Sequence, residues 1–456
     1  MSRSDCRLFS LLLLSAAVLL DAGYFSILAL ACVLLSLAFC FNGFSTTPRG
    51  PALPRWAGIV LVVCLGASTA LYDRKLDHPV FLVTAALLVV AVLLFSLVRA
   101  RVAQAAAFAL AALAGAVGIA ATITWGTAGI DVFQFQQSAS SALLHGHNPY
   151  TPLVVSPAVV APGVSTLLHL HFPYGPILPV LEAPFRLLGD VRVLHIVAAL
   201  ITAAAVLTLA RRAGTIDRAA CVVMAFPLSV GMVMSSWVDI ITMAFLAVWL
   251  VNFRSHPRVA TVALALALGA KPTTLIALVP IFFWSVRARR QTAIAAVAAA
   301  LFVVPFAFAT GLSQFYYNVL GVQLDVFPRF NALTVDTFLK TFSLPILPFV
   351  VSAIVVAAAT ILVLRRRPST YGDLLTGTAI LATVSFLVAK WAYFNYYYIP
   401  AVLLVLAIAG DSLPLDVPEM IRPPALFLRS VDWLRAAAGR FPRGSTVPGI
   451  SFPGRQ

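Results

Sequence analysis

The sequence has little charge, and most of what it has is of one sign. Only 10% of its 456 residues are charged, with 16 acidic against 31 basic, while 61% are hydrophobic. Uncharged stretches of about 20 residues, the length that crosses a bilayer core, follow one another along the chain and exclude an ordinary water-soluble domain. The alternation of apolar and polar residues typical of an outer-membrane barrel is also missing. The sequence therefore predicts a membrane protein built from helices.

Cysteine is scarce, and no residue pattern suits a metal. The pairs His145/His147 and His169/His171 have the spacing of a strand or a turn, but no acid or cysteine joins them at metal-site spacing. We therefore expect no bound metal and no cofactor. We also expect no disulfides, because every cysteine falls in an expected span or on the cytoplasmic side: Cys6, Cys32, Cys40, Cys64 and Cys221.

The hydrophobic segments predict an all-α, polytopic transmembrane bundle, because backbone polar groups in lipid must be satisfied within each segment. The first 22 residues resemble a signal peptide but lack a small-residue cleavage site. They predict a retained helical hairpin, with one long tilted helix as the alternative. The 14 expected spans are 8–20, 23–41, 56–72, 79–98, 102–124, 191–210, 219–235, 237–253, 259–270, 272–286, 292–309, 344–364, 374–389 and 393–409.

The basic residues predict the orientation of the bundle. Most arginines between the expected spans fall on the side that holds the N-terminus, among them Arg3, Arg211 and Arg287. By the positive-inside rule this side is cytoplasmic, and an even number of spans returns the basic tail to it. The net charge of +15 is thus explained by topology and anionic lipid rather than by nucleic acid. We expect a multi-pass protein of the inner (plasma) membrane.

Four regions differ in character. Residues 1–101 form simple spans that predict a scaffold, and residues 102–343 have short spans and two outer loops, 125–190 and 310–343. Residues 344–409 supply further spans, and residues 410–456 form a basic cytoplasmic tail. No internal repeat is evident, which disfavours a transporter built from inverted repeats.

Asp131 opens the longer outer loop. From Val132 onward, Val132, Phe135, Ala139 and Ala142 recur at helical spacing, with polar residues on the other faces. This predicts a short amphipathic helix on the membrane surface that begins at or next to Asp131. The carboxylate either caps this helix or has a functional role, because an ionisable group at the mouth of a bundle is costly to keep.

The order of motifs resembles the GT-C glycosyltransferases, and most closely the bacterial polyprenyl-phosphate-mannose-dependent α-mannosyltransferases. The resemblance covers residues 102–409 and rests on Asp131 after a helix, the Gly146-x-Asn148-Pro149-Tyr150 turn, Phe172-x-Tyr174-x-Pro176, and Lys271-Pro272 in a short helical hairpin. It implies transfer of a sugar, expected to be mannose, from a polyprenyl-phosphate donor to a glycolipid or glycan acceptor at the outer face.

That chemistry requires one base and a cation. The phosphate is already a good leaving group, so a single inverting displacement needs only Asp131 to take the acceptor's proton. Lys271 interrupts an apolar stretch and would hold the phosphate, unless it extends to the interface instead. Lys390, Arg329 and Lys340 are further candidates for the phosphate.

The substrate-binding candidates are Tyr150, Tyr174, His171, Asp239 and Glu182. Asp239 would bind a sugar hydroxyl or cap its own helix, and Glu182 would contact substrate or pair with Arg186 four residues later. The run from Asn395 to Tyr398 has the composition of an interfacial aromatic belt, with a role facing lipid as the alternative.

Two other functions compete with glycosyl transfer. One is a transporter or flippase for a lipid-linked saccharide, which would need polar groups along a path to both faces, whereas Asp131, Asp239, Lys271 and Lys390 fall on one side. The other is a non-catalytic assembly subunit, in which Asp131 would be dispensable. The oligomeric state is left open.

Overall fold

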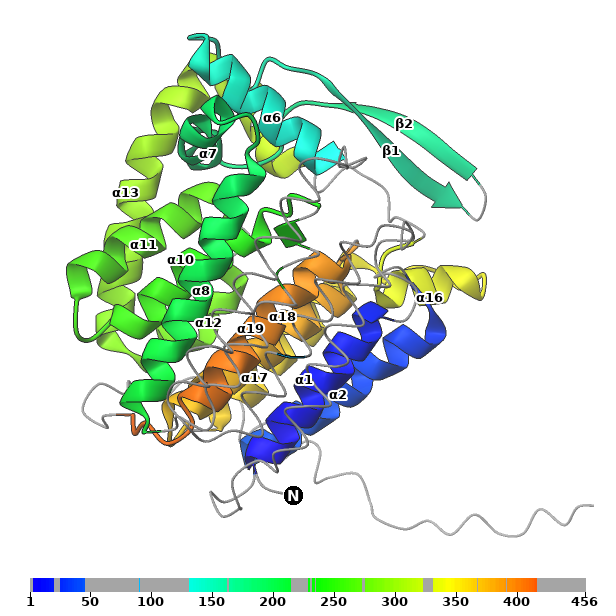
Figure 1. Ribbon diagram of the computed structural model, residues 1–456. Coiled ribbons are helices and arrows are strands. Elements are labelled where there is room, and N and C mark those ends of the chain that lie inside the picture. The colour runs from blue at the N-terminus through cyan, green and yellow to red at the C-terminus, as the bar shows by residue number, and fades with distance from the viewer. Residues whose placement is uncertain are drawn as a thin grey trace, which may run out of the picture.

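The structure is a computed structural model of the chain that describes residues 3–19, 25–45, 90, 131–161, 164–214, 229, 232–233, 235–272, 275–322, 331–366, 368–390 and 392–415. These residues are mostly helical, and the sheet among them is a single two-stranded hairpin (Figure 1). The helical class expected from the hydrophobic pattern is confirmed, while the hairpin was not expected.

Every expected span within the described residues is a helix. These helices are α1 (Arg3–Leu19), α2 (Ile27–Ser45), α8 (Arg192–Arg212), α10 (Asp239–Asn252), α11 (Pro257–Ala270), α12 (Leu275–Trp284), α13 (Val286–Thr310), α17 (Phe349–Arg365), α18 (Tyr371–Leu387) and α19 (Phe394–Ala409). The expected spans 56–72, 79–98 and 102–124, and most of 219–235, lie outside the described residues, as do Cys64, Cys221, Arg329 and the tail after 415.

Two described helices are long and apolar enough to cross a membrane, α8 with 21 residues and α13 with 25. The other apolar helices among the described residues are shorter. Length and composition are thus consistent with membrane association, and the 14-span topology stays a prediction.

The core lies around α18 and α19. Residues 402–409 of α19 are fully buried, and α19 packs against α1, α8, α10 and α18. Helices α1 and α2 pack on each other and on the α18–α19 pair, on the right of the view in Figure 1. The N-terminal helices are therefore joined directly to the C-terminal ones.

A buried ion-pair cluster fixes α1 in place. The guanidinium of Arg7 is buried; its Nη2 lies 2.7 Å from Oδ1 of Asp373 on α18, and its Nη1 pairs with Asp411. Arg3, one helical turn earlier, lies 2.9 Å from the other oxygen of Asp373. A buried charge is tolerated only when it is paired in this way, so the cluster specifies how α1 docks.

The longer outer loop contains α6 (Asp131–Leu144), strands β1 (Val154–Ala161) and β2 (Val164–Leu170), and α7 (Ile177–Leu187). The expected helix is confirmed as α6, and Val132, Phe135 and Ala139 of the expected apolar face are buried; the buried face is wider than expected because it also includes Gln136 and Ser140. Gln136 and Ser140, expected on other faces, are buried because each has a polar partner: the carbonyl of Ser236 and the carboxyl of Glu182.

The shorter elements α14 (Leu312–Tyr316), η3 (Tyr317–Gly321) and α16 (Val335–Thr341) come from the second outer loop. The π-helix η3 follows directly on α13 and α14. It brings the start of this loop next to the first one: Asn148, in the turn after α6, donates to the hydroxyl of Thr310 at 2.9 Å. The two loops therefore meet at one end of the bundle.

Candidate functional site

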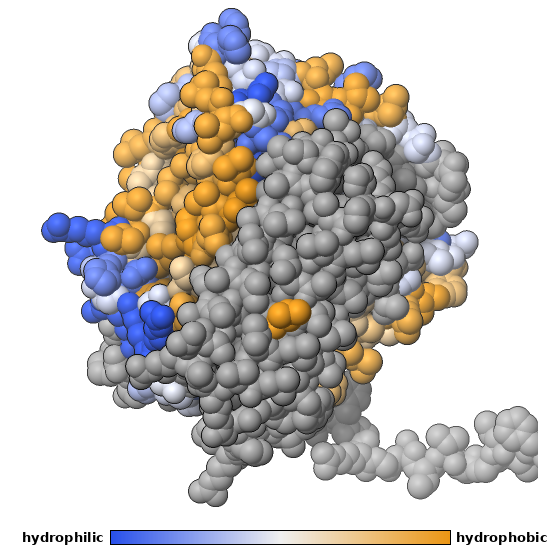
Figure 2. Space-filling view, in the orientation of Figure 1, coloured by the Kyte–Doolittle hydropathy of each residue, from blue (hydrophilic) through white to orange (hydrophobic). Residues whose placement is uncertain are grey.

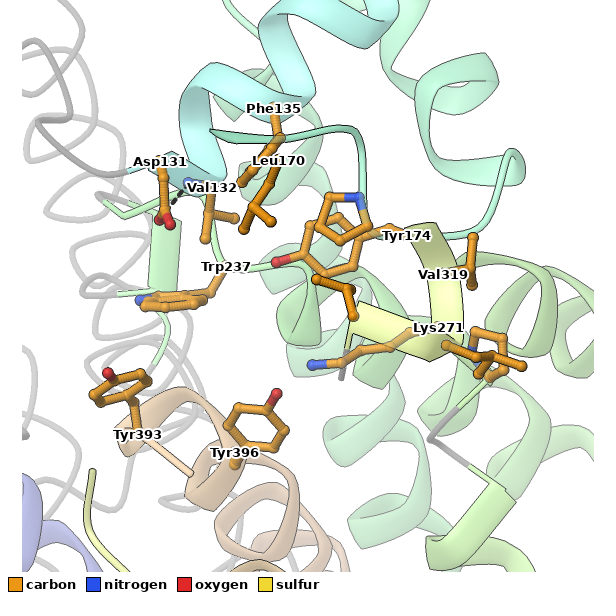
Figure 3. Close-up of a pocket in the computed structure, with 14 residues that line it drawn as sticks. Asp131, Val132, Phe135, Leu170, Tyr174, Trp237, Lys271, Val319, Tyr393 and Tyr396 are labelled. Carbon is orange, nitrogen blue, oxygen red and sulfur yellow. Dashed lines mark hydrogen bonds between the residues drawn. The ribbon is translucent and has the colours of Figure 1, made fainter. Parts of the chain in front are cut away.

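A cavity of about 850 Å³, open mouth included, lies at the end of the bundle where the two outer loops meet. Its polar and aromatic lining comes from Asp131, Tyr174, Trp237, Lys271, Tyr393 and Tyr396 (Figure 3). The remaining wall is apolar and includes Phe135, Leu170, Val319, Leu320 and Val322. Asp131 and Lys271, which stand 140 positions apart in the sequence, thus line one cavity, as expected.

Asp131 is the first residue of α6 and is partly exposed in the cavity wall. Its Oδ1 accepts from the backbone N–H of Val132 at 2.8 Å, and its Oδ2 accepts from the hydroxyl of Ser156 in β1. A carboxylate has about four lone-pair sites, and these two bonds use two of them. The carboxylate is therefore held in one orientation and can still accept a further proton donor.

Lys271 stands at the junction of α11 and α12. Its backbone is extended there, which ends α11, and its side chain points toward the space between Trp237 and Tyr396 (Figure 3). The ammonium Nζ lies 2.6 Å from Oδ1 of Asp239 and 4.4 Å from the centroid of the Tyr396 ring. The expected alternative, extension to the interface, is wrong because the side chain is buried and ion-paired.

Asp239 is the partner that keeps Lys271 in place. It begins α10 and is fully buried; its Oδ1 pairs with Lys271 and its Oδ2 accepts from Nδ2 of Asn395 at 2.8 Å. It does not line the cavity. We expected Asp239 to bind sugar or to cap its own helix, and the structure instead gives both oxygens to side chains of other segments.

The loop before α7 reaches the cavity because two glycines allow a close approach. The N–H of Gly175 donates to the carbonyl of Ala270 at 2.9 Å, and a Cβ on Gly175 would lie 1.8 Å from the oxygen of Gly269. A Cβ on Gly269 would in turn lie 2.2 Å from Cδ1 of Ile177. Only glycine permits this contact, which sets Tyr174 beside Lys271.

Tyr150 supports this loop from behind. Its hydroxyl donates to the carbonyl of Tyr174 at 2.8 Å, and its ring meets Phe172 and Phe315 edge to face at 5.7 and 5.0 Å. The side chain is buried and does not line the cavity, so its expected direct contact with substrate is not supported. Tyr174 does line the cavity.

His171 and Glu182 lie away from the cavity lining. His171 places Nδ1 3.3 Å from the carbonyl of Pro152. Glu182 is fully buried between α6 and α7, where Ser140 donates to it at 3.2 Å and burial raises its pKa well above the ordinary value. The expected pairing with Arg186 is wrong, because Arg186 donates to the carbonyl of Gly189.

Lys271 alone among the candidate cations in the described residues lines the cavity. Lys340, on α16, and Lys390, exposed before α19, both lie near Asp336. Burial raises the pKa of Asp336, while the N–H of Leu347 and these two lysines oppose the rise. The positions of Lys340 and Lys390 favour a role in the second outer loop rather than at the cavity.

Three aromatic residues that were not expected at the site also line it: Trp237, Tyr393 and Tyr396. The expected aromatic belt is wrong for the segment after Tyr393: Tyr397 and Tyr398 are buried in the core, and Asn395 is bound to Asp239. Their spacing could have predicted a shared helix face: Tyr393 and Tyr396 stand three positions apart, with the polar Asn395 between them, in an otherwise apolar span.

The arrangement offers a carboxylate base and a buried ammonium in an aromatic-walled cavity. Comparison of the chain with protein-family models, with curated proteins and with solved structures gives no match.

Proposed function

We propose that the protein is an inverting glycosyltransferase that moves a sugar, expected to be mannose, from a polyprenyl-phosphate donor to a glycolipid or glycan acceptor. The observation on which the proposal rests is the cavity that Asp131 and Lys271 line together with five aromatic side chains. A base and a phosphate-binding cation separated by aromatic rings are the groups that this transfer needs.

The distribution of polarity supports a membrane location with the cavity on the outside. On the described part of the face in Figure 2, hydrophobic surface lies between hydrophilic patches at the top and at the lower left. Exposed apolar side chains on α13 and α17 include Leu301, Phe308, Phe349 and Val350. Arg212 and Arg287 lie at the end of the bundle opposite to Asp239, where Arg212 donates to the carbonyl of Val251 near the end of α10 and Arg287 to that of Arg254. By the positive-inside rule, that end is cytoplasmic.

In the proposed reaction the acceptor hydroxyl attacks the anomeric carbon of the donor sugar. A new carbon–oxygen bond forms as the bond between that carbon and the phosphate oxygen breaks, and the electron pair leaves with the phosphate. Asp131 takes the hydroxyl proton, and the ammonium of Lys271 stabilises the charge on the departing phosphate. Because Asp239 and Asn395 fix the lysine beforehand, little reorganisation is needed.

The apolar wall suits the lipid part of the donor. Val319, Leu320 and Val322 line the cavity from the η3 segment, and Leu320 is also exposed on the outer surface. The neighbouring Leu312, Tyr316 and Tyr317 are exposed as well. Apolar residues in the cavity wall and on the neighbouring surface would let a prenyl chain remain in lipid while its phosphate reaches Lys271.

The test is turnover by the purified protein with a labelled polyprenyl-phosphate sugar and a glycolipid acceptor. We expect release of polyprenyl phosphate that depends on the acceptor, and a loss of at least about a hundredfold in kcat for Asp131→Asn. Asp131→Asn is nearly isosteric and keeps an oxygen for the Val132 N–H, so thermal unfolding should change little. Full turnover by a folded Asp131→Asn protein would refute the assignment of the base.

The buried Lys271–Asp239 pair is also a feature of transporters, where paired charges inside a bundle mark a substrate path. This alternative predicts movement of the lipid-linked saccharide across proteoliposomes without release of polyprenyl phosphate. A non-catalytic assembly subunit predicts neither result.

A further inference from the structure

The hairpin of β1 and β2 extends from the body of the protein, and its base lies at the cavity (Figure 1). The strands pair antiparallel with Val154 opposite Leu170 and Ser156 opposite Leu168. Leu170 lines the cavity from one strand. Ser156 reaches the same place from the other strand, because its hydroxyl donates to Oδ2 of Asp131.

Ser156 is fully buried although its side chain is polar. A buried hydroxyl loses its bonds to water, so it is retained where a protein partner replaces them. The partner here is a carboxylate, and hydrogen bonds to charged groups are stronger than those between neutral groups. The bond joins segments 25 residues apart, so it ties the hairpin to the first turn of α6.

The two bonds to Asp131 together determine where its remaining lone pairs point. The Val132 N–H belongs to the same helix and holds Oδ1 close to the backbone. That contact alone leaves the far oxygen unconstrained, and Ser156 constrains it. A general base must face the proton that it removes within hydrogen-bond distance, and small misplacements reduce rate steeply.

We propose that Ser156 is a positioning residue for the base, and this inference rests on the proposed function. The Ser156 hydroxyl keeps Oδ2 of Asp131 fixed, so that the unused lone pairs face the acceptor hydroxyl. Ser156 itself neither gives nor receives the transferred proton. The hairpin therefore belongs to the site, because a residue of β1 that contributes no reacting atom sets the orientation of the base.

Ser156→Thr and Ser156→Val form a matched pair for the test. Both add bulk at Cβ and suit a strand, and they differ only in the hydroxyl. In the acceptor-dependent transfer assay we expect Ser156→Thr to stay within about threefold of the wild-type kcat, and Ser156→Val to lose about tenfold to a hundredfold. The donor KM should change little, because the Ser156 hydroxyl binds the proposed base and not the proposed phosphate-binding group. Ser165, exposed on β2 of the same hairpin, is the control position, where the Thr and Val variants should be equal.

Two further measurements separate positioning from a structural role. In an Asp131→Asn background, the Thr and Val variants should have the same residual activity, since the hydroxyl acts only through Asp131. The infrared carboxylate band assigned with Asp131→Asn should differ between Ser156→Thr and Ser156→Val even without turnover. Equal kcat in the two variants, a difference that persists without Asp131, or an unchanged band would each overturn the inference. Full activity of Asp131→Asn would instead refute the assignment of the base, and a wild-type protein that releases no polyprenyl phosphate in the presence of acceptor would refute the proposed function.

Discussion

Removing the charge of Lys271 should have two effects that can be separated. Lys271→Met keeps most of the side-chain volume but leaves the carboxylate of Asp239 buried with Asn395 as its remaining partner. Breaking one partner out of a buried ion pair destabilises a protein by about 3–5 kcal/mol. We therefore expect a large fall in thermal stability together with the loss of phosphate binding.

The double variant Lys271→Met/Asp239→Asn distinguishes these effects. The Asn side chain fits the space of Asp239 and carries no buried charge, and its amide oxygen can still accept from Asn395. Replacing a buried pair by neutral groups of similar size is often close to neutral in stability. We expect the double variant to recover most of the lost stability but to stay at least about a hundredfold below wild type in kcat/KM, because the donor phosphate still lacks its cation.

The assays are thermal unfolding in detergent and acceptor-dependent release of polyprenyl phosphate. Lys390→Met is the matched control, since Lys390 is exposed and lies off the cavity. That variant should stay within about 0.5 kcal/mol of wild type and keep its turnover. A double variant with wild-type kcat/KM would show that Lys271 serves only as a structural counter-ion, and the phosphate role would be refuted.

Two other changes test the surroundings of the site. Gly175→Ala would place a Cβ 1.8 Å from the oxygen of Gly269, so the loop must move and the hydrogen bond to Ala270 is lost. We expect the protein to be destabilised by at least about 1–3 kcal/mol and sugar transfer to fall. An unchanged unfolding midpoint would contradict the packing argument. Glu182→Gln tests the raised pKa: a carboxyl whose folded pKa lies above its ordinary value of 4.5 stabilises the protein fully below that value and less as pH rises toward the folded pKa. The Gln variant should therefore lose less stability than wild type as the pH is raised, and its turnover should be unchanged. Parallel curves of stability against pH for the two proteins would refute a neutral Glu182.

The local hydrophobic pattern was sufficient to predict the helices. The expected spans 191–210 and 393–409 correspond closely to α8 (Arg192–Arg212) and α19 (Phe394–Ala409), because an apolar run must bury or satisfy its backbone as a helix. The hairpin was missed although Val154, Val155, Val164 and Thr166 favour strands, and Pro162-Gly163 between them favours a turn. This segment had been expected only as part of the longer outer loop, with no hairpin assigned to it.

The scarcity of charged side chains in apolar segments was sufficient to draw attention to the two charged residues of the cavity. A carboxylate at a helix start and an ammonium within an apolar stretch are both costly, and this cost placed Asp131 and Lys271 among the candidates. The same reasoning also selected Lys340, Lys390 and Glu182, which do not line the cavity. The roles of Tyr150 and Asp239 could not be predicted in the same way. The sequence cannot distinguish a buried tyrosine that supports a loop from one that contacts a ligand. The hydrogen bond from the Tyr150 hydroxyl to the carbonyl of Tyr174 shows that Tyr150 supports the loop.

The sequence by itself determined that the described residues are largely helical, approximately where the long apolar helices lie, and which charges, Asp131 and Lys271 among them, needed an explanation. The cost of exposing the backbone of a hydrophobic run, or of placing a charge within one, depends on the local sequence and not on distant partners, so both can be recognised from the sequence. The tertiary structure decided that Asp239 pairs with Lys271 and accepts from Asn395, that Ser156 donates to Asp131, and that glycines 175 and 269 let two segments touch. These contacts join residues far apart in the chain, so their existence depends on the packing of the whole bundle.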